Sequence, residues 1–450
     1  IFIFFKISLQ NDLGFFKSVI EVISLKEQRA IWEVRKAALN IMMSMRGDGK
    51  PISFIEDCAV ELQDLAEFTD RLTNVFKKYD TSGTWYAHAS VGCLHVRPIL
   101  NLKQELDVKK MRSIAEKAFE LVREYKGSHS GEHGDGLVRA EFHTKMFGKK
   151  VVSIFEKIKD QFDPNSRMNP GKIVRPFKMD DRSLMRYKPY YKHEKFSTTL
   201  DWSYWGSFGQ AVEMCNNNGA CRKLNSGVMC PSYMVTKNEH DLTRGRANAL
   251  RLAISGQLGP NALISDNMAQ SMKLCVSCKG CKRECPTGVD MARMKIEFLF
   301  QYYKKNSMGL REKLIAYIPR YSPLIRHFQW LIDFANKVPY SRTLIEKAFG
   351  FSRFRSLPKW KHAGTRSLEK NKLFQNKKCD VKSDKPPVAL LADTFNFYFE
   401  PENILAAMRV LSFAGYTPII VKPISGRRPL CCGRTFLSAG LVDEAKVEMN

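Results

Sequence analysis

The sequence has no hydrophobic run long enough to cross a membrane. Its longest early apolar run, residues 1–5, ends at Lys6, whereas a membrane-spanning helix needs roughly 20 apolar residues. The sequence also has no signal-peptide pattern and no initiating Met, so we expect that residue 1 is not the natural start of the protein and that the chain is a fragment. These absences exclude a membrane-spanning protein and predict a cytoplasmic location.

Acidic residues are few compared with basic ones. The 450 residues include 72 Lys and Arg but only 46 Asp and Glu, which gives a net charge of +26. Such a surplus favours anionic partners, namely acidic proteins, anionic lipid, nucleic acid or polycarboxylate substrates, without choosing among them. The length predicts about three domains, and 44% apolar residues allow each to bury a core, which excludes wholesale disorder.

The cysteines are unevenly distributed along the chain. Seven of the 12 lie between Cys215 and Cys285. In a long chain without secretory features, this crowding indicates metal binding rather than disulfides and predicts a reducing compartment. Cys58, Cys93 and Cys379 have no partner by spacing, and we interpret them as ordinary thiols.

Local patterns predict an α+β first domain over residues 1–175. Apolar residues at helical spacing predict one helix over 26–46, and a second helix is predicted over 107–125. Between them, residues 84–89 and 93–100 are predicted strands on either side of a turn at Gly92.

Four further segments follow in the predicted domain order. A polar and basic linker covers 176–201, and the cysteine-rich segment covers 202–303. Residues 304–385 hold 20 Lys or Arg and 6 Asp or Glu, and we expect their prolines to break them into short helices; these are Pro319, Pro323, Pro339 and Pro358. Residues 386–450 show a β-α-β pattern that stops before it looks finished, which predicts a truncated α/β domain.

Four cysteines have the spacing of a bacterial ferredoxin. Cys275, Cys278, Cys281 and Cys285, followed by Pro286, match C-x2-C-x2-C-x3-C-P. Three thiolates at this spacing can surround one face of a cubane, and the fourth normally serves a different cluster. A structural zinc site is the alternative, but zinc usually draws two cysteine pairs from separated knuckles. The spacing therefore predicts a [4Fe-4S] cluster.

The upstream cysteines depart from this pattern. Asn218 stands where a middle cysteine belongs, and eight residues separate Cys221 from Cys230. If each group donates its last cysteine to the other cluster, Cys230 completes the first cluster, and Cys215, Cys221 and Cys285 are left for a second. A three-iron cluster, a four-iron cluster with a non-cysteine ligand, or no cluster would fit three thiolates.

A second set of metal-ligand residue types lies in the first domain. His88 and His95 would face opposite sides of one continuous strand, but the turn at Gly92 lets both face one point. A glycine-rich loop adds Glu132 and His133. Two histidines and one carboxylate leave open positions on a divalent ion such as zinc, which is the catalytic pattern. The alternative is a pair of core histidines and a surface glutamate.

Several motifs resemble known families. The segments "YAHASVGCLHVRP", "GSHSGEHGDGLVR" and "FDPNSRMNPGKIV" resemble the C-terminal half of FAD-linked 2-hydroxyacid dehydrogenases of the vanillyl-alcohol oxidase superfamily. "CPSYMVT" and "TRGRANALR" resemble the iron–sulfur subunit of glycolate oxidase, and "CCGRTF", with Cys431 and Cys432, resembles the cysteine-rich domain shared with heterodisulfide reductases. Together they are similar to the large bacterial fused FAD and iron–sulfur enzymes of the D-2-hydroxyglutarate dehydrogenase type.

The resemblance implies a role for individual residues. The two histidines of the predicted hairpin and Glu132 would hold the divalent ion, and His133 would be the catalytic base. Arg35 and Lys50 keep the family's spacing of two substrate-carboxylate ligands, although Leu39 stands where the family has a Thr. Asn169 matches a residue of the family's flavin-contacting loop.

The resemblance also implies cofactors and an activity. FAD would be bound mainly by a domain preceding residue 1, so we expect that this chain does not hold FAD by itself. The implied reaction is oxidation of a D-2-hydroxyacid, best D-2-hydroxyglutarate, with electrons passing through the clusters to a protein or quinone acceptor. D-lactate or glycolate is the alternative substrate if Arg35 binds the only carboxylate. A non-catalytic electron-transfer or assembly subunit is the alternative of another class.

The basic segment 304–385 has two interpretations. It docks an acidic electron acceptor or lies on anionic lipid at the membrane periphery, with 324–334 as an interfacial helix, or it is a solvated connector. Nucleic-acid binding is not expected, because no recognised binding motif accompanies the charge.

Overall fold

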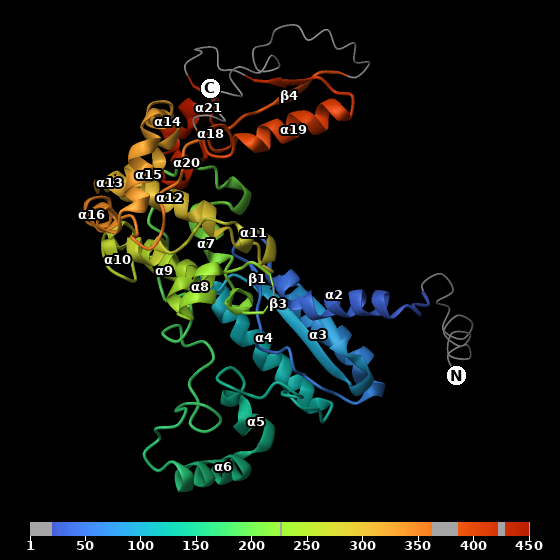
Figure 1. Cartoon of the computed structure of the whole chain (residues 1–450). Helices are drawn as coiled ribbons and strands as arrows, with labels where there is room; N and C mark the ends of the chain where they lie inside the picture. The colour runs from blue at the N-terminus through green and yellow to red at the C-terminus, as the bar shows by residue number, and fades with distance from the viewer. Residues whose placement is uncertain (1–19, 226, 362–385, 422–427, 450) are drawn as a thin grey trace. The chain divides into compact units, whose positions relative to one another are not determined.

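The computed structural model describes residues 20–225, 227–361, 386–421 and 428–449 (Figure 1). Part of the predicted basic segment, residues 362–385 with Cys379, lies outside these residues. The chain divides into two compact units. The first unit comprises Ile1–Glu194, Ser203–Lys223 and Arg283–Val289, and the second comprises Lys195–Trp202, Leu224–Lys282 and Asp290–Asn450.

The first unit contains a small antiparallel sheet of order β1-β3-β2. Strands β2 (Gly83–His88) and β3 (Cys93–Leu100) form a hairpin in which Tyr86 pairs with His95 and His88 with Cys93, so the predicted strands are confirmed. Strand β1 (Lys50–Pro51) pairs with the far end of β3.

Gly92 makes the hairpin turn. Its φ of +69° is the left-handed conformation, and a Cβ there would lie 1.9 Å from the carbonyl oxygen of Val60. Only glycine avoids both the backbone strain and this collision. The close approach seats segment 57–60 against the start of β3, where Leu94 N–H donates to the carbonyl of Cys58.

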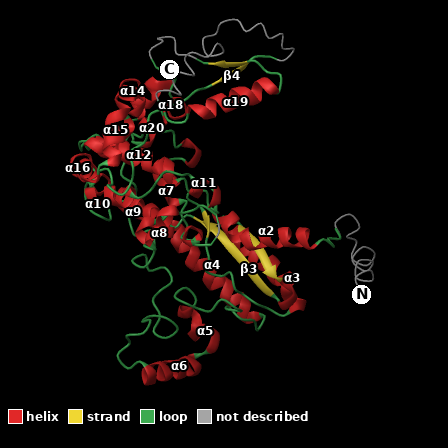
Figure 2. Cartoon of the chain, viewed as in Figure 1, coloured by secondary structure: helices red, strands yellow, loops and turns green. Residues whose placement is uncertain are grey.

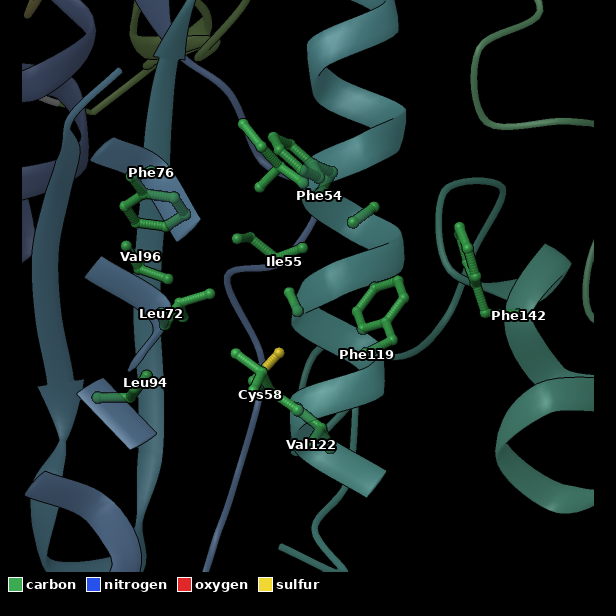
Figure 3. Packing of buried hydrophobic residues seen from close by; sticks show 14 of the residues in the cluster. Phe54, Ile55, Cys58, Leu72, Phe76, Leu94, Val96, Phe119, Val122 and Phe142 are labelled. Carbon is green, nitrogen blue, oxygen red and sulfur yellow. The ribbon is translucent and has the colours of Figure 1, made fainter. Parts of the chain in front are cut away.

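Helices cover the sheet and form the core of the first unit. Figure 3 shows Phe54, Ile55 and Cys58 between strand β3 and helix α4. Helix α3 (Leu65–Lys78) contributes its buried face at a spacing of four residues. The helices of this part are α2 (Leu25–Met43), α3, α4 (Glu105–Glu124), α5 (His143–Phe147), α6 (Lys149–Phe162) and α7 (Phe208–Glu213). The two predicted helices correspond to α2 and α4, but the apolar residues that predicted α2, such as Ile31 and Val34, are exposed.

The second unit is mostly helical (Figure 2). Its cysteine-rich part contains α8 (Pro231–Thr236), α9 (Thr243–Ile254), α10 (Asp266–Lys273) and α12 (Met291–Tyr303), and α11 (Gly280–Glu284) lies at the boundary of the two units. The basic part contains α13 (Leu310–Ala316), α14 (Ile318–Ile325), α15 (Gln329–Lys337) and α16 (Pro339–Phe349). Pro319 and Pro339 start helices, but the prediction that Pro323 breaks one is wrong. Pro323 lies inside α14, a short helix in which it removes only one backbone hydrogen bond.

The predicted β-α-β pattern near residue 400 is confirmed. Strands β4 (Val388–Leu390) and β5 (Pro418–Ile420) are parallel, and helix α19 (Pro401–Phe413) connects them. Three further helices of this part are α18 (Thr394–Tyr398), α20 (Arg434–Ser438) and α21 (Val442–Met449).

The predicted linker 176–201 contains no helix or strand, but it is not a free tether. The buried carboxylate of Glu297 on α12 accepts hydrogen bonds from the backbone N–H groups of Thr199 and Leu200, at 3.1 and 3.0 Å. The end of this segment is therefore fixed to the second unit. Among the helices described here, none combines the length and apolar character required to cross a membrane.

Candidate metal and cysteine sites

Three imidazoles surround one oxygen of Glu132. Its Oε1 lies 2.9 Å from Nε2 of His95, 3.2 Å from Nε2 of His133 and 3.3 Å from Nε2 of His88. The hairpin supplies His88 and His95, and the loop after α4 supplies Glu132 and His133. The turn at Gly92 thus brings two histidines seven positions apart to one point. We call these four residues the Glu132 group.

The donor atoms of the Glu132 group fit a divalent cation. Nδ1 of His95 lies 2.8 Å from the carbonyl oxygen of Glu56, which can only accept, so this nitrogen carries the proton. Nε2 is then the ring nitrogen that faces Glu132, an arrangement typical of metal-binding histidines. Ligand atoms of Asp57, His95, Glu132 and His133 all lie within 4.8 Å of one another, and His88 contacts the same Glu132 oxygen.

The sequence did not identify Asp57, which holds the loop of the Glu132 group. Its fully buried carboxylate accepts hydrogen bonds from the backbone N–H groups of Glu132 (3.0 Å) and His133 (2.8 Å) and from the hydroxyl of Ser130 (3.2 Å). Burial works to raise the pKa of Asp57, but these backbone donors lower it overall. Two adjacent acidic residues in the apolar run 54–60 were the available signal, because a buried carboxylate needs donors.

His133 has carboxylates behind its ring and space in front of it. Its Nδ1 lies 3.8 Å from Asp57 Oδ1 and 3.9 Å from Glu56 Oε1, while its Nε2 faces Glu132. Its side chain is 38% exposed, and its ring stacks on His95 with 4.7 Å between centroids.

The ring of Tyr86 lies between Arg35 and His95, whereas Lys50 is farther along the sheet. The Arg35 guanidinium carbon is 4.9 Å from the ring centroid of Tyr86, and that ring is 5.1 Å from the ring of His95. Lys50 pairs with Leu100, five residues beyond His95 on β3, which places the two backbones roughly 17 Å apart.

Lys50 belongs to a different pocket. Its ammonium donates to the carbonyl of Met45 and lies 3.8 Å from the sulfur of Met214. Asp48, Lys103 and other polar side chains line the same pocket. Burial lowers the pKa of Lys50.

Asn169 lies on an exposed loop. Asp163 anchors this loop by accepting hydrogen bonds from the backbone N–H groups of Arg167 and Met168, both at 2.8 Å. The side chain of Asn169 is exposed and lies 3.5 Å from the ammonium of Lys172. Its predicted contact with flavin stays a prediction.

Cys58 and Cys93 are buried thiols of the first unit. Burial, reinforced by the charges of Asp57 and Glu132, raises the pKa of Cys93 to about 12, and burial also raises the pKa of Cys58. Both therefore stay protonated and are poor nucleophiles and ligands.

Four of the predicted cluster ligands line one pocket in the second unit. Cys230, Cys275, Cys278 and Cys281 share it with the buried side chain of Arg246. No disulfide joins the cysteines that the structure describes, and no group of metal-ligand atoms within 4.8 Å of one another in the described residues includes a cysteine. Four cysteines around one pocket supply the number of thiolates that one [4Fe-4S] cluster takes.

Positive charges adjoin the cysteine pocket. Arg246 donates to the carbonyl of Ser271 (2.9 Å) and the hydroxyl of Ser232 (3.1 Å), and its Nη1 lies 3.7 Å from Cys230 Sγ. The ammonium of Lys295 donates to the carbonyl of Cys275 at 2.6 Å. Burial raises the pKa of Cys281 to about 11, so the bare pocket holds this cysteine as a thiol, and these cations would offset the negative charge of thiolates bound to a cluster.

The remaining cysteines are distributed over both units. Cys215 and Cys221 are buried, Cys285 is half-buried, and all three belong to the first unit. In the second unit, Gly433 N–H donates to Cys431 Sγ at 3.4 Å, and burial raises the pKa of Cys431. The neighbouring Arg434 reaches the carbonyl of Ser277, at 3.5 Å, in the loop that carries Cys275 and Cys278.

Comparison with known proteins gives two domain matches. Residues 14–173 match the family of FAD linked oxidases, C-terminal domain, and residues 211–289 match the 4Fe-4S dicluster domain. The order of these two matches agrees with the order expected from the sequence.

Named relatives are similar over most of this chain. D-2-hydroxyglutarate dehydrogenase of Escherichia coli is 26% identical over 430 residues, covering 87% of this chain and 42% of the relative. The Haemophilus influenzae enzyme of the same name is 25% identical over 435 residues, with 87% and 41% coverage. Glycolate oxidase subunit GlcD of Bacillus subtilis is 27% identical over 148 residues, with 33% and 31% coverage. The chain thus spans less than half the length of each of these relatives.

Proposed function

We propose that this chain, in which a FAD-linked oxidase C-terminal domain precedes a 4Fe-4S dicluster domain, takes part in oxidising a D-2-hydroxyacid to the 2-oxoacid. The observation that carries the proposal is the Glu132 group, where three imidazoles meet one carboxylate oxygen and two of them, His88 and His133, are exposed to solvent. The relatives named D-2-hydroxyglutarate dehydrogenase support the substrate class and make D-2-hydroxyglutarate the first candidate.

His133 is the proposed base. Its exposed Nε2 accepts the substrate hydroxyl proton, and the carboxylates of Glu56 and Asp57 near Nδ1 stabilise the resulting imidazolium. His88, His95 and Glu132 would hold a divalent ion, which supplies Lewis acidity toward the hydroxyl and carboxylate oxygens.

The redox chemistry belongs to the bound cofactors. FAD supplies an acceptor for the C2 hydride, and iron–sulfur clusters supply the one-electron transfers that follow. We assign the first [4Fe-4S] cluster to the cysteines of the described pocket, and a second cluster to Cys215, Cys221 and Cys285 with a ligand still to be identified. We also propose that residues 386–450, with Cys431 and Cys432, belong to a cysteine-rich domain.

The test of the base is His133→Ala in the flavin-loaded enzyme. We expect substrate to reduce the flavin at least ~100-fold more slowly while the flavin stays bound, because the hydroxyl proton has lost its acceptor. Lys157→Ala, which removes a positive side chain from the exposed face of α6, is the matched control and should leave the rate unchanged. An unaltered rate in His133→Ala would eliminate the proposed role.

The clusters are tested by iron content and paramagnetic spectra of anaerobically purified protein. One four-iron cluster gives roughly four iron atoms per chain, and a second raises this toward eight. Cys278→Ser should remove the signal of the first cluster, whereas Cys93→Ser should not, because Cys93 is a buried thiol outside the pocket. Colourless, iron-free protein would overturn the assignment.

The separation of Lys50 from the histidines favours a second candidate function. Arg35 is near enough to the Glu132 group to bind one substrate carboxylate by a bidentate contact, and a substrate with a single carboxylate needs no second cation. D-lactate and glycolate are such substrates.

Turnover on three substrates separates the candidates. If Lys50 binds a second carboxylate, Lys50→Ala raises KM for D-2-hydroxyglutarate and leaves KM for D-lactate unchanged. If Arg35 binds the only carboxylate, Lys50→Ala changes the KM for both substrates equally or for neither. Arg35→Ala then raises the KM for every substrate. Preferred turnover of D-lactate or glycolate would exclude the dicarboxylate assignment.

We also propose that the basic helical segment lies on anionic lipid. On α15, Trp330 and Phe334 are four residues apart, and both are exposed, as is Leu331. Exposed aromatic and aliphatic side chains in a segment with a surplus of positive charge are typical of interfacial helices.

Sedimentation with vesicles tests this surface. The chain should bind vesicles containing phosphatidylglycerol and not pure phosphatidylcholine, and binding should fall with ionic strength. Trp330→Ser with Phe334→Ser should abolish binding, whereas Val410→Ser, at an exposed position of α19, should not. Equal binding to both lipids, or to neither, would contradict the proposal.

A further inference from the structure

Two buried histidines and one aspartate converge next to the Glu132 group. Nε2 of His129 lies 3.2 Å from Asp135 Oδ1, and Nε2 of His143 lies 3.2 Å from Asp135 Oδ2. One ligand atom from each residue lies within 4.8 Å of the others. The side chains of His129 and His143 are 0% and 3% exposed. We call these three residues the Asp135 group.

Hydrogen bonding fixes the protonation of His143. Its Nδ1 lies 3.1 Å from the carbonyl oxygen of Ile173, which can only accept, so Nδ1 carries the proton. Nε2 faces the carboxylate of Asp135 at 3.2 Å, and either a proton or a metal ion must lie between the two atoms. Two acceptors 3.2 Å apart in a buried place repel each other unless a positive charge lies between them.

The same atoms have no other partners in the described structure. Both ring nitrogens of His129, Nε2 of His143 and Oδ1 of Asp135 are buried without a well-oriented hydrogen bond. Buried polar groups in proteins are normally satisfied, so these atoms call for a bound partner, such as an ion. The backbone carbonyl that orients His143 corresponds to the outer hydrogen bond typical of metal-binding histidines.

We propose that His129, Asp135 and His143 bind a zinc-like divalent cation as a buried structural site, distinct from the Glu132 group. Two imidazoles and the two oxygens of one carboxylate give the four donors that zinc takes in structural sites. The two buried histidines distinguish this group from the Glu132 group, in which His88, Glu132 and His133 are exposed.

The site would fasten the loop that carries the Glu132 group. His129 and Asp135 lie on either side of Glu132 and His133 in the sequence, and His143 is the first residue of α5. An ion shared by the three therefore ties both ends of the loop to α5. This inference concerns structure and does not depend on the proposed oxidation.

The experiment is a zinc count on the full chain with its iron–sulfur clusters in place, after excess zinc is removed on a chelating resin. We expect about two zinc ions per chain in the wild type, about one in His143→Gln, about one in His95→Gln and none in the double variant. An unchanged zinc count in His143→Gln would overturn the proposal and would point to a buried proton instead. Loss of all zinc in His95→Gln would also overturn the proposal.

If the His143→Gln variant does not fold, a second measurement tests the same site. X-ray absorption at the zinc edge of the His95→Gln variant should show nitrogen and oxygen ligands, including imidazole, at about 2.0–2.2 Å and no sulfur. A sulfur shell at about 2.3 Å would place the remaining zinc on cysteine and would overturn the site. Neither measurement uses catalytic activity, so both can still be interpreted if the proposed oxidation is wrong.

Discussion

The Glu132 group and the cysteine pocket have surroundings of opposite charge. Behind His133 lie the carboxylates of Glu56 and Asp57, and beside the cysteine sulfurs and backbone lie Arg246 and Lys295. Carboxylates stabilise a bound cation or an imidazolium, whereas cations stabilise thiolates and a cluster with net negative charge. Each centre is thus adapted to one charge state, and substitutions that change the surrounding charge test this difference.

The largest effect is expected from Glu132→Gln. The amide keeps the shape of the side chain but removes the negative charge that three imidazoles share, so turnover should fall about 100-fold or more. The melting temperature should stay unchanged, because this side chain is 44% exposed. Glu120→Gln on the exposed face of α4 is the control for both measurements.

Glu213 tests the effect of surrounding charge at a place that needs no cofactor. Its buried carboxylate lies 2.8 Å from His193 Nε2 and 2.6 Å from the ammonium of Lys103. Burial works to raise the pKa of Glu213, but His193 and Lys103 lower it to about 2. Because the folded pKa lies below the unfolded value, this stabilisation is present above about pH 4.5 and is lost as the pH falls toward 2.

Glu213→Gln should therefore destabilise the chain in a pH-dependent way. We expect a loss of about 3 kcal/mol at pH 7 that shrinks as the pH approaches 2, measured by urea unfolding across this range. An equal loss at all pH values would show that packing, rather than charge, makes Glu213 important.

Asp57→Asn should loosen the loop of the Glu132 group. The new amide N–H₂ would face the backbone N–H groups of Glu132 and His133, which then lose acceptors, so we expect about 1–3 kcal/mol of destabilisation. Hydrogen exchange at these two amides should become faster. The paramagnetic spectrum of the clusters should not change, and a changed spectrum would contradict the local effect.

The smallest effect is expected from Arg246→Gln. Removing a buried positive charge next to Cys230 favours the oxidised cluster, so its reduction potential should fall by roughly 50 mV, or about 1 kcal/mol for one electron. Arg246→Lys keeps the charge and should shift the potential less. The reduction potential is measured by a redox titration of the paramagnetic signal. An unchanged potential in Arg246→Gln would show that this arginine does not influence the cluster.

Local spacing predicted much of the fold and part of the site. The apolar patterns predicted α2 and α4, and the glycine turn predicted the hairpin that carries both histidines. Four of the predicted cysteines line one pocket, and their role as cluster ligands stays a prediction. Each of these features depends on residues close together in sequence, or on a motif whose geometry is fixed by its own spacing.

Contacts between distant segments were not predictable in this way. Asp57 meets Glu132 from 75 positions away, and Glu297 meets Leu200 from 97 positions away. The separation of Lys50 from His95 depends on the register of β1 with β3, which no single-strand pattern specifies. Sequence spacing did not group His129 with His143, because the two become neighbours only when the loop after α4 and the start of α5 lie together in the fold.

The seven residues from His129 to Asp135 contribute donors to both histidine groups, and this gives the two groups a thermodynamic connection. An ion in the Asp135 group would limit the conformations of residues 129–135 before an ion enters the Glu132 group. Such linkage is reciprocal, since any factor by which one ion tightens the other operates equally in the opposite direction. Depletion of metal would then empty the two positions cooperatively, and the response of this chain to metal supply would be steeper than that of a protein with two independent ions.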